Sequence, residues 1–245
     1  MLTKSRSLQA MAGLIRESGR EVRFKRHDHL VRRGERADRV FVLQDGWAAR
    51  YSQMPDGGRH ISHFYLPGDL CDLSWLASAE AGQTVSALTP IKAVTIDRDP
   101  IEERLAADAM FAQCVAVDSL LRLEAQTQWM VTLGRRPAVE RLAQLICELY
   151  LRSEQKGRAV NRECSFPLSQ QHLADYTGMS VVHVCRTLRR MRDLGLLDLR
   201  RRRLRIPDFA NLASICGFPF GQWGIQRRTP SRHHRPQSLE WAATA

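Results

Sequence analysis

Residues 167–208 read PLSQQHLADYTGMSVVHVCRTLRRMRDLGLLDLRRRRLRIPD, the most specific pattern in the chain. Ser169 is placed to cap a short helix over residues 170–176. A tight turn follows, in which Gly178 is free to adopt a positive φ, and Ser180 can then cap a second helix. This order of elements predicts a helix-turn-helix.

The second helix is predicted to be amphipathic. Its apolar stripe repeats every three or four residues and consists of Val184, Leu188, Met191 and Leu194. The opposite face carries Val182, Arg186, Arg189 or Arg190, and Asp193. Because Ala174 and Gly178 are small, the two helices can cross closely through the turn.

The segment LLDLRRRRLRI, residues 196–206, predicts a strand, an arginine-rich hairpin and a second strand. Its four consecutive arginines, Arg200, Arg201, Arg202 and Arg203, suit contacts with phosphates. A plain helix hairpin with a solvated basic face is the alternative. The clustering of arginines on the second helix and on this hairpin favours a winged helix-turn-helix.

The net charge of +11 lies entirely in the second half of the chain. Residues 1–134 carry 17 basic and 17 acidic side chains, whereas residues 135–245 carry 20 basic and nine acidic ones. This asymmetry predicts one module that binds a polyanion and one that does not. Nucleic acid is the leading partner and an anionic membrane surface the weaker one.

Residues 21–97 contain short runs of strand-forming residues separated by turn residues. Asp45-Gly46 and Asp56-Gly57-Gly58 are hairpin signals. The pattern predicts an antiparallel β-barrel or jelly roll.

Helical periodicity follows from Asp99 to Leu133, with a break near Ala107, and Gly134 interrupts it. A heptad-like seam in this helix consists of Met110, Cys114, Val117 and Leu121. The seam fits dimerisation and packing against the β unit equally well. The chain is thus expected to have an α+β fold with five parts: an N-terminal segment (1–20), a β unit (21–98), a long helix and hinge (99–134), a basic module (135–216) and a disordered basic tail (217–245).

The stretches LSQQHLADYTGMSVVHVCRTLRRMRDLGLL and FYLPGDL resemble the cyclic-AMP receptor protein and fumarate-nitrate regulator (Crp/Fnr) superfamily of bacterial transcription regulators. The resemblance covers about residues 20–215. It implies an N-terminal antiparallel β-roll of the cyclic-nucleotide-binding type, a long dimerisation helix and a C-terminal winged helix-turn-helix. It also implies a cytoplasmic homodimer that reads a palindrome in double-stranded DNA and has RNA polymerase as a partner.

The same resemblance implies a set of DNA-contacting residues: Ser169, Gln170, Ser180, Val181, Val182, His183, Arg186, Arg189, Arg190, Arg201 and Arg202. Arg186 matches the base-reading arginine of the family. Val182 replaces the glutamate of members that share the best-known operators, and Val181 replaces an arginine of cyclic-AMP receptors. Since valine can contact a thymine methyl group but cannot accept a hydrogen bond from cytosine, a different half-site is expected.

The β unit lacks the residues that hold a cyclic nucleotide in the family. Asp72-Leu73 stands near the position of the ribose-binding Gly-Glu pair, and no arginine accompanies Gln83 and Thr84 to hold the phosphate. An iron-sulfur cluster is not expected, because the first cysteine is Cys71. Haem bound through Cys71 or a nearby histidine is the alternative, but a packed thiol is favoured, so no cofactor is expected and the effector stays unidentified.

No stretch approaches the roughly 20 apolar residues of a membrane span, and the start of the chain lacks a signal-peptide core. The six cysteines contain no Cys-x-x-Cys pair, so reduced thiols and a cytoplasmic location are expected. A cupin-like metal-dependent enzyme with an accessory nucleic-acid-binding module is the alternative function. Its candidate ligands are His27, Asp28, His29, Glu35, His60 and His63. Their spacing argues against it, because Glu35 follows His29 by six residues.

Overall fold

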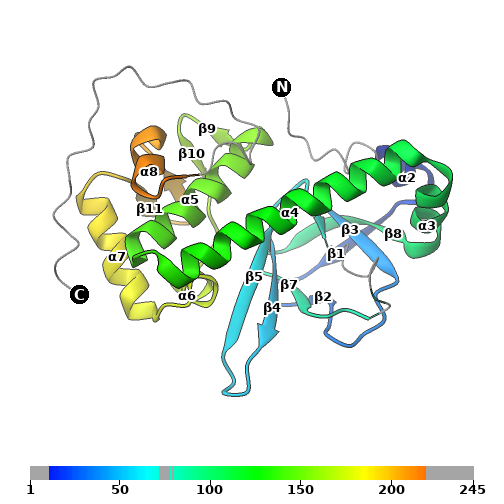
Figure 1. Ribbon diagram of the computed structural model, residues 1–245, viewed down its shortest axis with the longest axis horizontal. Coiled ribbons are helices and arrows are strands. Elements are labelled where there is room, and N and C mark those ends of the chain that lie inside the picture. The colour runs from blue at the N-terminus through cyan, green and yellow to red at the C-terminus, as the bar shows by residue number, and fades with distance from the viewer. Residues whose placement is uncertain (1–10, 72–77, 79, 219–245) are drawn as a thin grey trace.

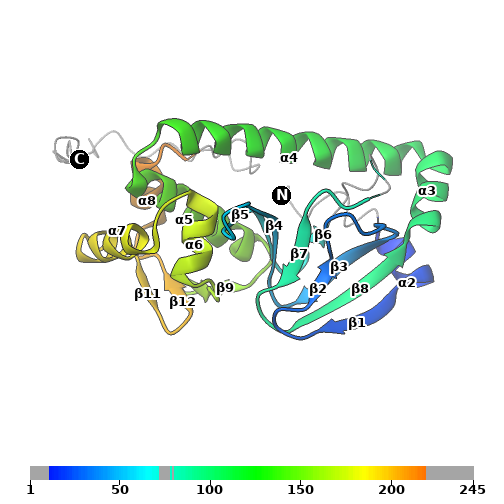
Figure 2. The same cartoon turned by 90° about the horizontal axis from the view of Figure 1, so that it is seen from below.

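The computed structural model describes residues 11–71, 78 and 80–218. A β-roll and a mostly helical module lie side by side, and one long helix, α4, runs past both of them (Figures 1 and 2). This arrangement confirms the predicted fold class.

The β-roll consists of two four-stranded antiparallel sheets. One sheet has the order β1 (Arg20–Phe24), β8 (Ile91–Asp97), β3 (Arg39–Asp45), β6 (Leu70–Cys71). The other has the order β2 (His29–Val31), β7 (Thr84–Ala87), β4 (Ala48–Gln53), β5 (Arg59–Tyr65). The runs of strand-forming residues therefore form strands as predicted.

One of the two predicted hairpins is wrong. Asp56-Gly57-Gly58 does close the β4–β5 hairpin, where the Met54 amide donates to the Gly58 carbonyl at 2.8 Å. Asp45-Gly46 instead joins β3 to β4, which lie in different sheets. Gly46 has a φ of +87°, and a Cβ there would meet the Pro90 carbonyl oxygen at 2.2 Å, so the glycine serves a crossing between sheets.

Three helices flank the β-roll: α2 (Ala12–Ser18), α3 (Arg98–Ala107) and α4 (Ala109–Arg135). The predicted break is confirmed at Asp108, whose carboxylate accepts from the Phe111 amide at 3.0 Å and caps α4. The predicted interruption at Gly134 is wrong by one residue, because α4 continues through Gly134 to Arg135. Pro137 then stands immediately before α5.

The C-terminal module contains α5 (Ala138–Gln155), α6 (Gln170–Thr177), α7 (Val181–Asp193) and α8 (Phe209–Ile215). A small antiparallel sheet completes it, in the order β11 (Asp198–Arg200), β12 (Arg203–Arg205), β10 (Glu163–Ser165), β9 (Ala159–Val160). The two strands and hairpin predicted within residues 196–206 are confirmed as β11 and β12.

The core of the C-terminal module continues into the β-roll and α4. Tyr176 of α6 stacks on Phe64 of β5, with ring centroids 5.0 Å apart, and its ring lies 4.6 Å from that of Trp129 in α4. All three side chains are buried. The helix-turn-helix is therefore anchored on the β-roll by an aromatic cluster. Among the described residues, no helix is long and apolar enough to cross a bilayer.

Candidate nucleic-acid interface

The first helix of the helix-turn-helix, α6, begins with a reciprocal cap. The Ser169 hydroxyl accepts from the His172 amide at 3.2 Å, and His172 Nδ1 accepts from the Ser169 amide at 3.2 Å. Burial, and then the neighbouring Arg59, lower the pKa of His172 to about 4. The imidazole is therefore neutral near pH 7, as an acceptor at Nδ1 requires.

The turn and the second helix follow the predicted pattern except at one position. Gly178 adopts a φ of +67°, and the Ser180 hydroxyl accepts from the His183 amide at 3.2 Å. Val184, Leu188 and Met191 are buried. Leu194 is 50% exposed, so its predicted place in the apolar stripe is wrong. It follows the last helical residue, Asp193, where the chain leaves the helical periodicity.

The outer face of α7 combines apolar and basic side chains. Val181, Val182 and His183 are exposed in its first turn, Val182 by 59%. The arginines of this face are also exposed, and none forms an ion pair with another described residue: Arg186, Arg189 and Arg190. Their guanidinium groups are available to an external anion.

Two of the four wing arginines form ion pairs with described residues, and two do not. Arg200 pairs with Asp198 at 2.9 Å, and Arg203 pairs with Glu163. Arg201 and Arg202 form the tip of the β11–β12 hairpin, with φ values of +47° and +63°. Both are exposed, and neither forms an ion pair within the described part of the chain. These two arginines are the ones that the sequence assigns to DNA.

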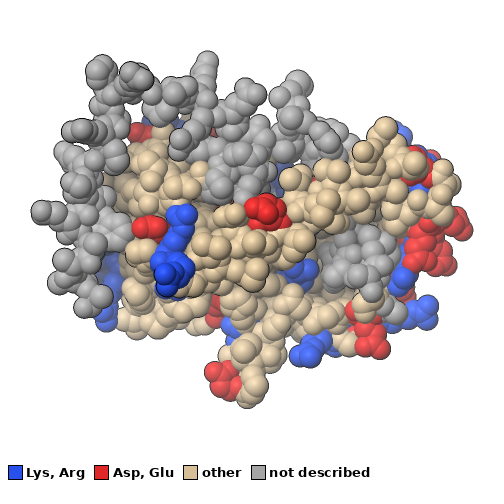
Figure 3. All heavy atoms as spheres, in the orientation of Figure 1, with Lys and Arg blue, Asp and Glu red and all other residues tan. Residues whose placement is uncertain are grey.

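The predicted seam on α4 is only partly exposed. Met110 and Leu121 are 67% and 51% exposed, whereas Cys114 and Val117 are half-buried. Four further apolar residues, which the heptad reading missed, are also exposed: Leu120, Leu123, Met130 and Val131. Leu120, Leu123 and Met130 are spaced by three and seven residues, a helical repeat that a second alignment of the heptad would have found. The part of α4 visible in Figure 3 carries few charged side chains.

Ion pairs that no sequence pattern predicted hold the C-terminal module to the β-roll. Arg59 Nε of β5 donates to Asp175 Oδ2 of α6 at 2.6 Å. Arg152 Nη2 of α5 donates to Asp69 Oδ2 at 2.5 Å and to the Phe64 carbonyl at 2.7 Å, and Lys156 pairs with the same carboxylate. Burial raises the pKa of Asp69, but Arg152 and Lys156 outweigh it and hold this pKa well below its ordinary value.

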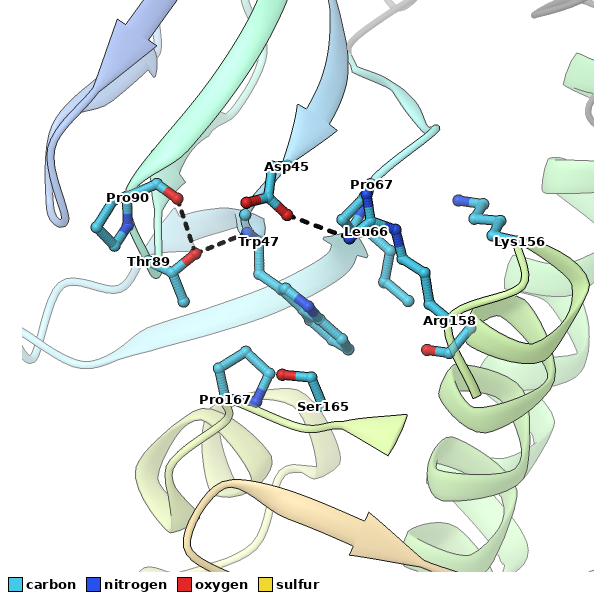
Figure 4. A pocket seen from close by; sticks show the side chains of 12 residues that line it. Asp45, Trp47, Leu66, Pro67, Thr89, Pro90, Lys156, Arg158, Ser165 and Pro167 are labelled. Atoms are coloured by element: carbon cyan, nitrogen blue, oxygen red, sulfur yellow. Dashed lines mark hydrogen bonds and ion pairs between the residues drawn. The ribbon is translucent and has the colours of Figure 1, made fainter. Parts of the chain in front are cut away.

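A cavity of about 560 Å³ lies beside these ion pairs, between the two modules. Its walls include Trp47, Leu66 and Pro67 from the β-roll, and Ser165 and Pro167 from the C-terminal module. Figure 4 shows Trp47 reaching across toward Ser165 and Pro167, with Arg158 held by Asp45 on the other side. The cavity belongs to the contact between modules and is separate from the outer face of α7.

The polar side chains that line the β-roll sheet bond to one another. Arg50 donates to Ser62 at 3.3 Å, and Ser62 donates to Gln83 at 3.0 Å. Gln83 in turn donates to Ser52 at 2.8 Å, and Thr84 accepts from the Arg33 amide at 3.1 Å. Asp72 and Leu73, which the sequence argument also used, lie outside the described residues.

The histidines considered as metal ligands do not gather. His29 lies 3.5 Å from the Tyr51 hydroxyl and 3.3 Å from Arg32, and His63 packs its ring against Tyr65. Burial, and then Arg152, lower the pKa of His63. Within the part of the chain that the structure describes, no three His, Cys, Asp or Glu side chains are grouped as a metal ion requires.

Comparison with known proteins matches both modules. Residues 21–108 match the cyclic nucleotide-binding domain, and residues 140–215 match the Crp-like helix-turn-helix domain. The chain is 26% identical over 212 residues to the nitrogen fixation regulation protein FixK of Azorhizobium caulinodans, covering 86% of this chain and 83% of that protein. It is 28% identical over 188 residues to the transcriptional activator protein FnrL of Cereibacter sphaeroides, covering 75% of each.

The fold is also similar to that of solved structures. FixK2 from Bradyrhizobium japonicum superposes with a TM-score of 0.73 at 23% identity, covering 80% of this chain and 96% of that structure. These matches favour a regulator over the metal-dependent enzyme. With a β-roll, a long helix and a winged helix-turn-helix in the same order, and with both domains matched, the chain belongs to the Crp/Fnr family of DNA-binding transcription regulators.

Proposed function

We propose that this chain is a homodimeric regulator, without enzymatic activity, that reads an inverted repeat in double-stranded DNA. The observation that carries the proposal is the outer face of α7. It presents exposed arginines, which form no ion pair with other described residues, between a capped turn and an arginine-tipped wing. A stable helix with free guanidinium groups on one side is suited to the major groove, and the wing is suited to the adjacent backbone.

The residues divide into two roles. Arg186 is assigned to a base edge, with Val181, Val182 and His183 beside it on the first turn of α7. A guanidinium pairs with guanine O6 and N7, and Val182 can contact a thymine methyl group. The remaining assigned residues position the protein on phosphates: Ser169, Gln170, Ser180, Arg189, Arg190, Arg201 and Arg202.

The dimer is proposed to form through α4, and the exposed apolar residues of this helix support it. They lie away from Phe111, Val115 and Trp129, which α4 buries against its own chain. The proposed contact combines the predicted seam with the residues that the structure adds: Met110, Cys114, Val117, Leu120, Leu121, Leu123, Met130 and Val131. Two α7 helices related by a two-fold axis would then enter successive major grooves roughly 34 Å apart.

The proposed regulator does not depend on cyclic AMP or cyclic GMP, and no cofactor is assigned to it. The network of Arg50, Ser52, Ser62 and Gln83 supports this, because these polar groups already bond to one another. In addition, the sequence places no arginine beside Gln83 and Thr84. Membership of the family supports a cytoplasmic location and RNA polymerase as the protein partner.

Selection of bound sequences from a random duplex pool tests the proposal. The expected result is an inverted repeat whose half-site centres are about one helical turn apart. Enrichment of an asymmetric half-site would overturn the dimeric reading. Failure to enrich any sequence would overturn specific DNA recognition.

A further inference from the structure

The cavity of about 560 Å³ between the two modules is a feature that the DNA-reading surface does not use. Its volume lies within the range of small-molecule sites, which often form where two domains meet. The residues that line it come from stretches 45–47, 66–67 and 89–90 of the β-roll and from stretches 153–158 and 165–167 of the C-terminal module. A molecule bound in this cavity would therefore touch both modules.

The inner part of the cavity is apolar and fixed in shape. The Trp47 side chain is buried, with its ring edge-on to that of Phe166 at a centroid distance of 6.2 Å, and its amide donates to Thr89 Oγ1 at 2.9 Å. Leu66, which is also buried, lies beside it. Three proline rings complete the apolar lining: Pro67, Pro90 and Pro167. Since indole and proline rings present flat apolar faces, this part of the cavity suits a planar ring.

The opening of the cavity is charged. Arg158 Nη1 pairs with Asp45 Oδ1 at 3.2 Å, and Arg158 Nη2 donates to the Gln44 carbonyl at 2.9 Å (Figure 4). The Arg158 and Asp45 side chains are 48% and 70% exposed, and an ion pair in water contributes little to stability. A guanidinium also pairs readily with a carboxylate through two parallel hydrogen bonds. The carboxylate of a ligand could therefore replace Asp45 on Arg158.

Lys156 adds a second cation to the lining. It shares the Asp69 carboxylate with Arg152. Burial lowers the pKa of Lys156, and Arg152 lowers it further, although Asp69 acts in the opposite direction. An anion in the cavity would favour the charged ammonium of Lys156. The charged residues that line the cavity are thus two cations, Lys156 and Arg158, and one carboxylate, Asp45, which favours an anionic ligand.

We propose that this cavity binds a flat aromatic carboxylate, with its ring against Trp47 and the prolines and its carboxylate on Arg158. The inference goes beyond the proposed function, because it assigns a small-molecule site that is separate from the DNA-reading surface. Such a ligand can touch both modules only while they are packed together. Its binding would therefore stabilise the arrangement of the modules that the structure shows.

The test titrates the full chain, without DNA, with 2-naphthoate and with the uncharged 2-naphthamide. Calorimetry should give a dissociation constant of about 0.1 mM for 2-naphthoate and a value about ten-fold weaker for the amide. Arg158→Gln should weaken 2-naphthoate about ten-fold and leave 2-naphthamide unchanged. Ser165→Leu, which fills the cavity from β10, should abolish binding of both. At ten times its dissociation constant, 2-naphthoate should raise the Tm of the wild type by about 4 °C.

Arg50→Gln is the matched control for Arg158→Gln. Arg50 lies on β4, outside the lining of the cavity, and donates to Ser62 at 3.3 Å. Its loss should leave both affinities unchanged. The inference is overturned if neither probe binds, if both bind equally tightly, if Ser165→Leu still binds them, or if Arg50→Gln weakens binding as much as Arg158→Gln does. Because the titrations contain no DNA, their outcome is independent of whether the chain recognises a DNA sequence.

Discussion

Arg152 Nη2 lies 2.5 Å from Asp69 Oδ2, and this contact joins α5 to the turn that follows β5. Both side chains are largely buried, and Arg152 also bonds to Glu148 and to the Phe64 carbonyl. Since a buried charge without its partner is costly, the pair holds the two modules in one arrangement.

Asp69→Asn should lower the free energy of unfolding by about 3 kcal/mol, because it leaves Arg152 and Lys156 without their carboxylate. Urea denaturation at pH 7 measures the loss. The folded-state pKa of Asp69 is depressed. Its stabilising contribution is therefore present above the unfolded pKa of about 3.9 and is lost as the pH falls below it. The difference between wild type and variant should shrink in that acid range, and equal stability at pH 7 would refute the argument.

Arg186→Ala should weaken binding to the best site by about 1–3 kcal/mol and relax the preference at one position of each half-site. Arg201→Ala, at the wing tip, should weaken binding to all sequences alike. Binding to a series of single-base variants distinguishes the two effects. The opposite pattern would mean that α7 is not the reading helix.

Leu120→Glu combined with Leu123→Glu should separate the dimer, because these exposed residues lie about one turn apart on the same side of α4 and would place like charges in the proposed contact. Light scattering should report a monomer, and affinity for the full repeat should fall toward that for a half-site. Met54→Glu is the control, since Met54 is an exposed apolar residue in the β4–β5 hairpin. If the α4 variant remained dimeric, the exposed apolar residues of α4 would not form the dimer contact.

Cyclic AMP and cyclic GMP should give no binding isotherm at physiological concentrations. The sequence has no arginine beside Gln83 and Thr84, and Arg50, which connects to Gln83 through Ser62, already donates to the Ser62 hydroxyl. Titration calorimetry checks this, with a cyclic-AMP receptor of the same family as the positive control. A micromolar dissociation constant for either nucleotide would contradict the prediction.

His172→Gln should keep the capping box of α6, because glutamine can also accept from the Ser169 amide, whereas His172→Ala should cost about 1 kcal/mol. The folded-state pKa of His172 is about 4, below the unfolded value of about 6.5. The stability of the wild type relative to His172→Gln should therefore be complete above pH 6.5 and fall as the pH drops toward 4. Thermal unfolding across this range gives the comparison, and a pH-independent difference would exclude a neutral buried imidazole.

Local signals predicted most of the helix-turn-helix. Ser169, Gly178 and Ser180 specify caps and a turn through their own backbone neighbours, so no distant contact is needed to place them. The hairpin predicted at Asp45-Gly46 failed because the same turn residues serve a crossing between two sheets. The prediction that Leu194 belongs to the apolar stripe was wrong because hydrophobic periodicity does not show where a helix ends.

The ion pairs between the modules could not be predicted from the sequence, for a different reason. Asp69 and Arg152 are separated by 83 residues, and Arg59 and Asp175 by 116. No regular sequence spacing predicts either pair, because only the packing of the C-terminal module on the β-roll brings the two side chains of each pair together. The proposed module boundaries divide the chain by residue number, whereas the aromatic cluster of Phe64, Trp129 and Tyr176 crosses them.

The ring of Tyr176 has consequences for how the molecule denatures. Phe64 and Trp129, which cover that ring, belong to the β-roll and to α4. A fragment limited to residues 135–216 would expose one side of the Tyr176 ring to water. Its free energy of unfolding would therefore lack the contribution from burying that apolar surface. The stability of the C-terminal module thus depends in part on its packing against the β-roll and α4. Heat should therefore unfold the two modules in a single cooperative transition.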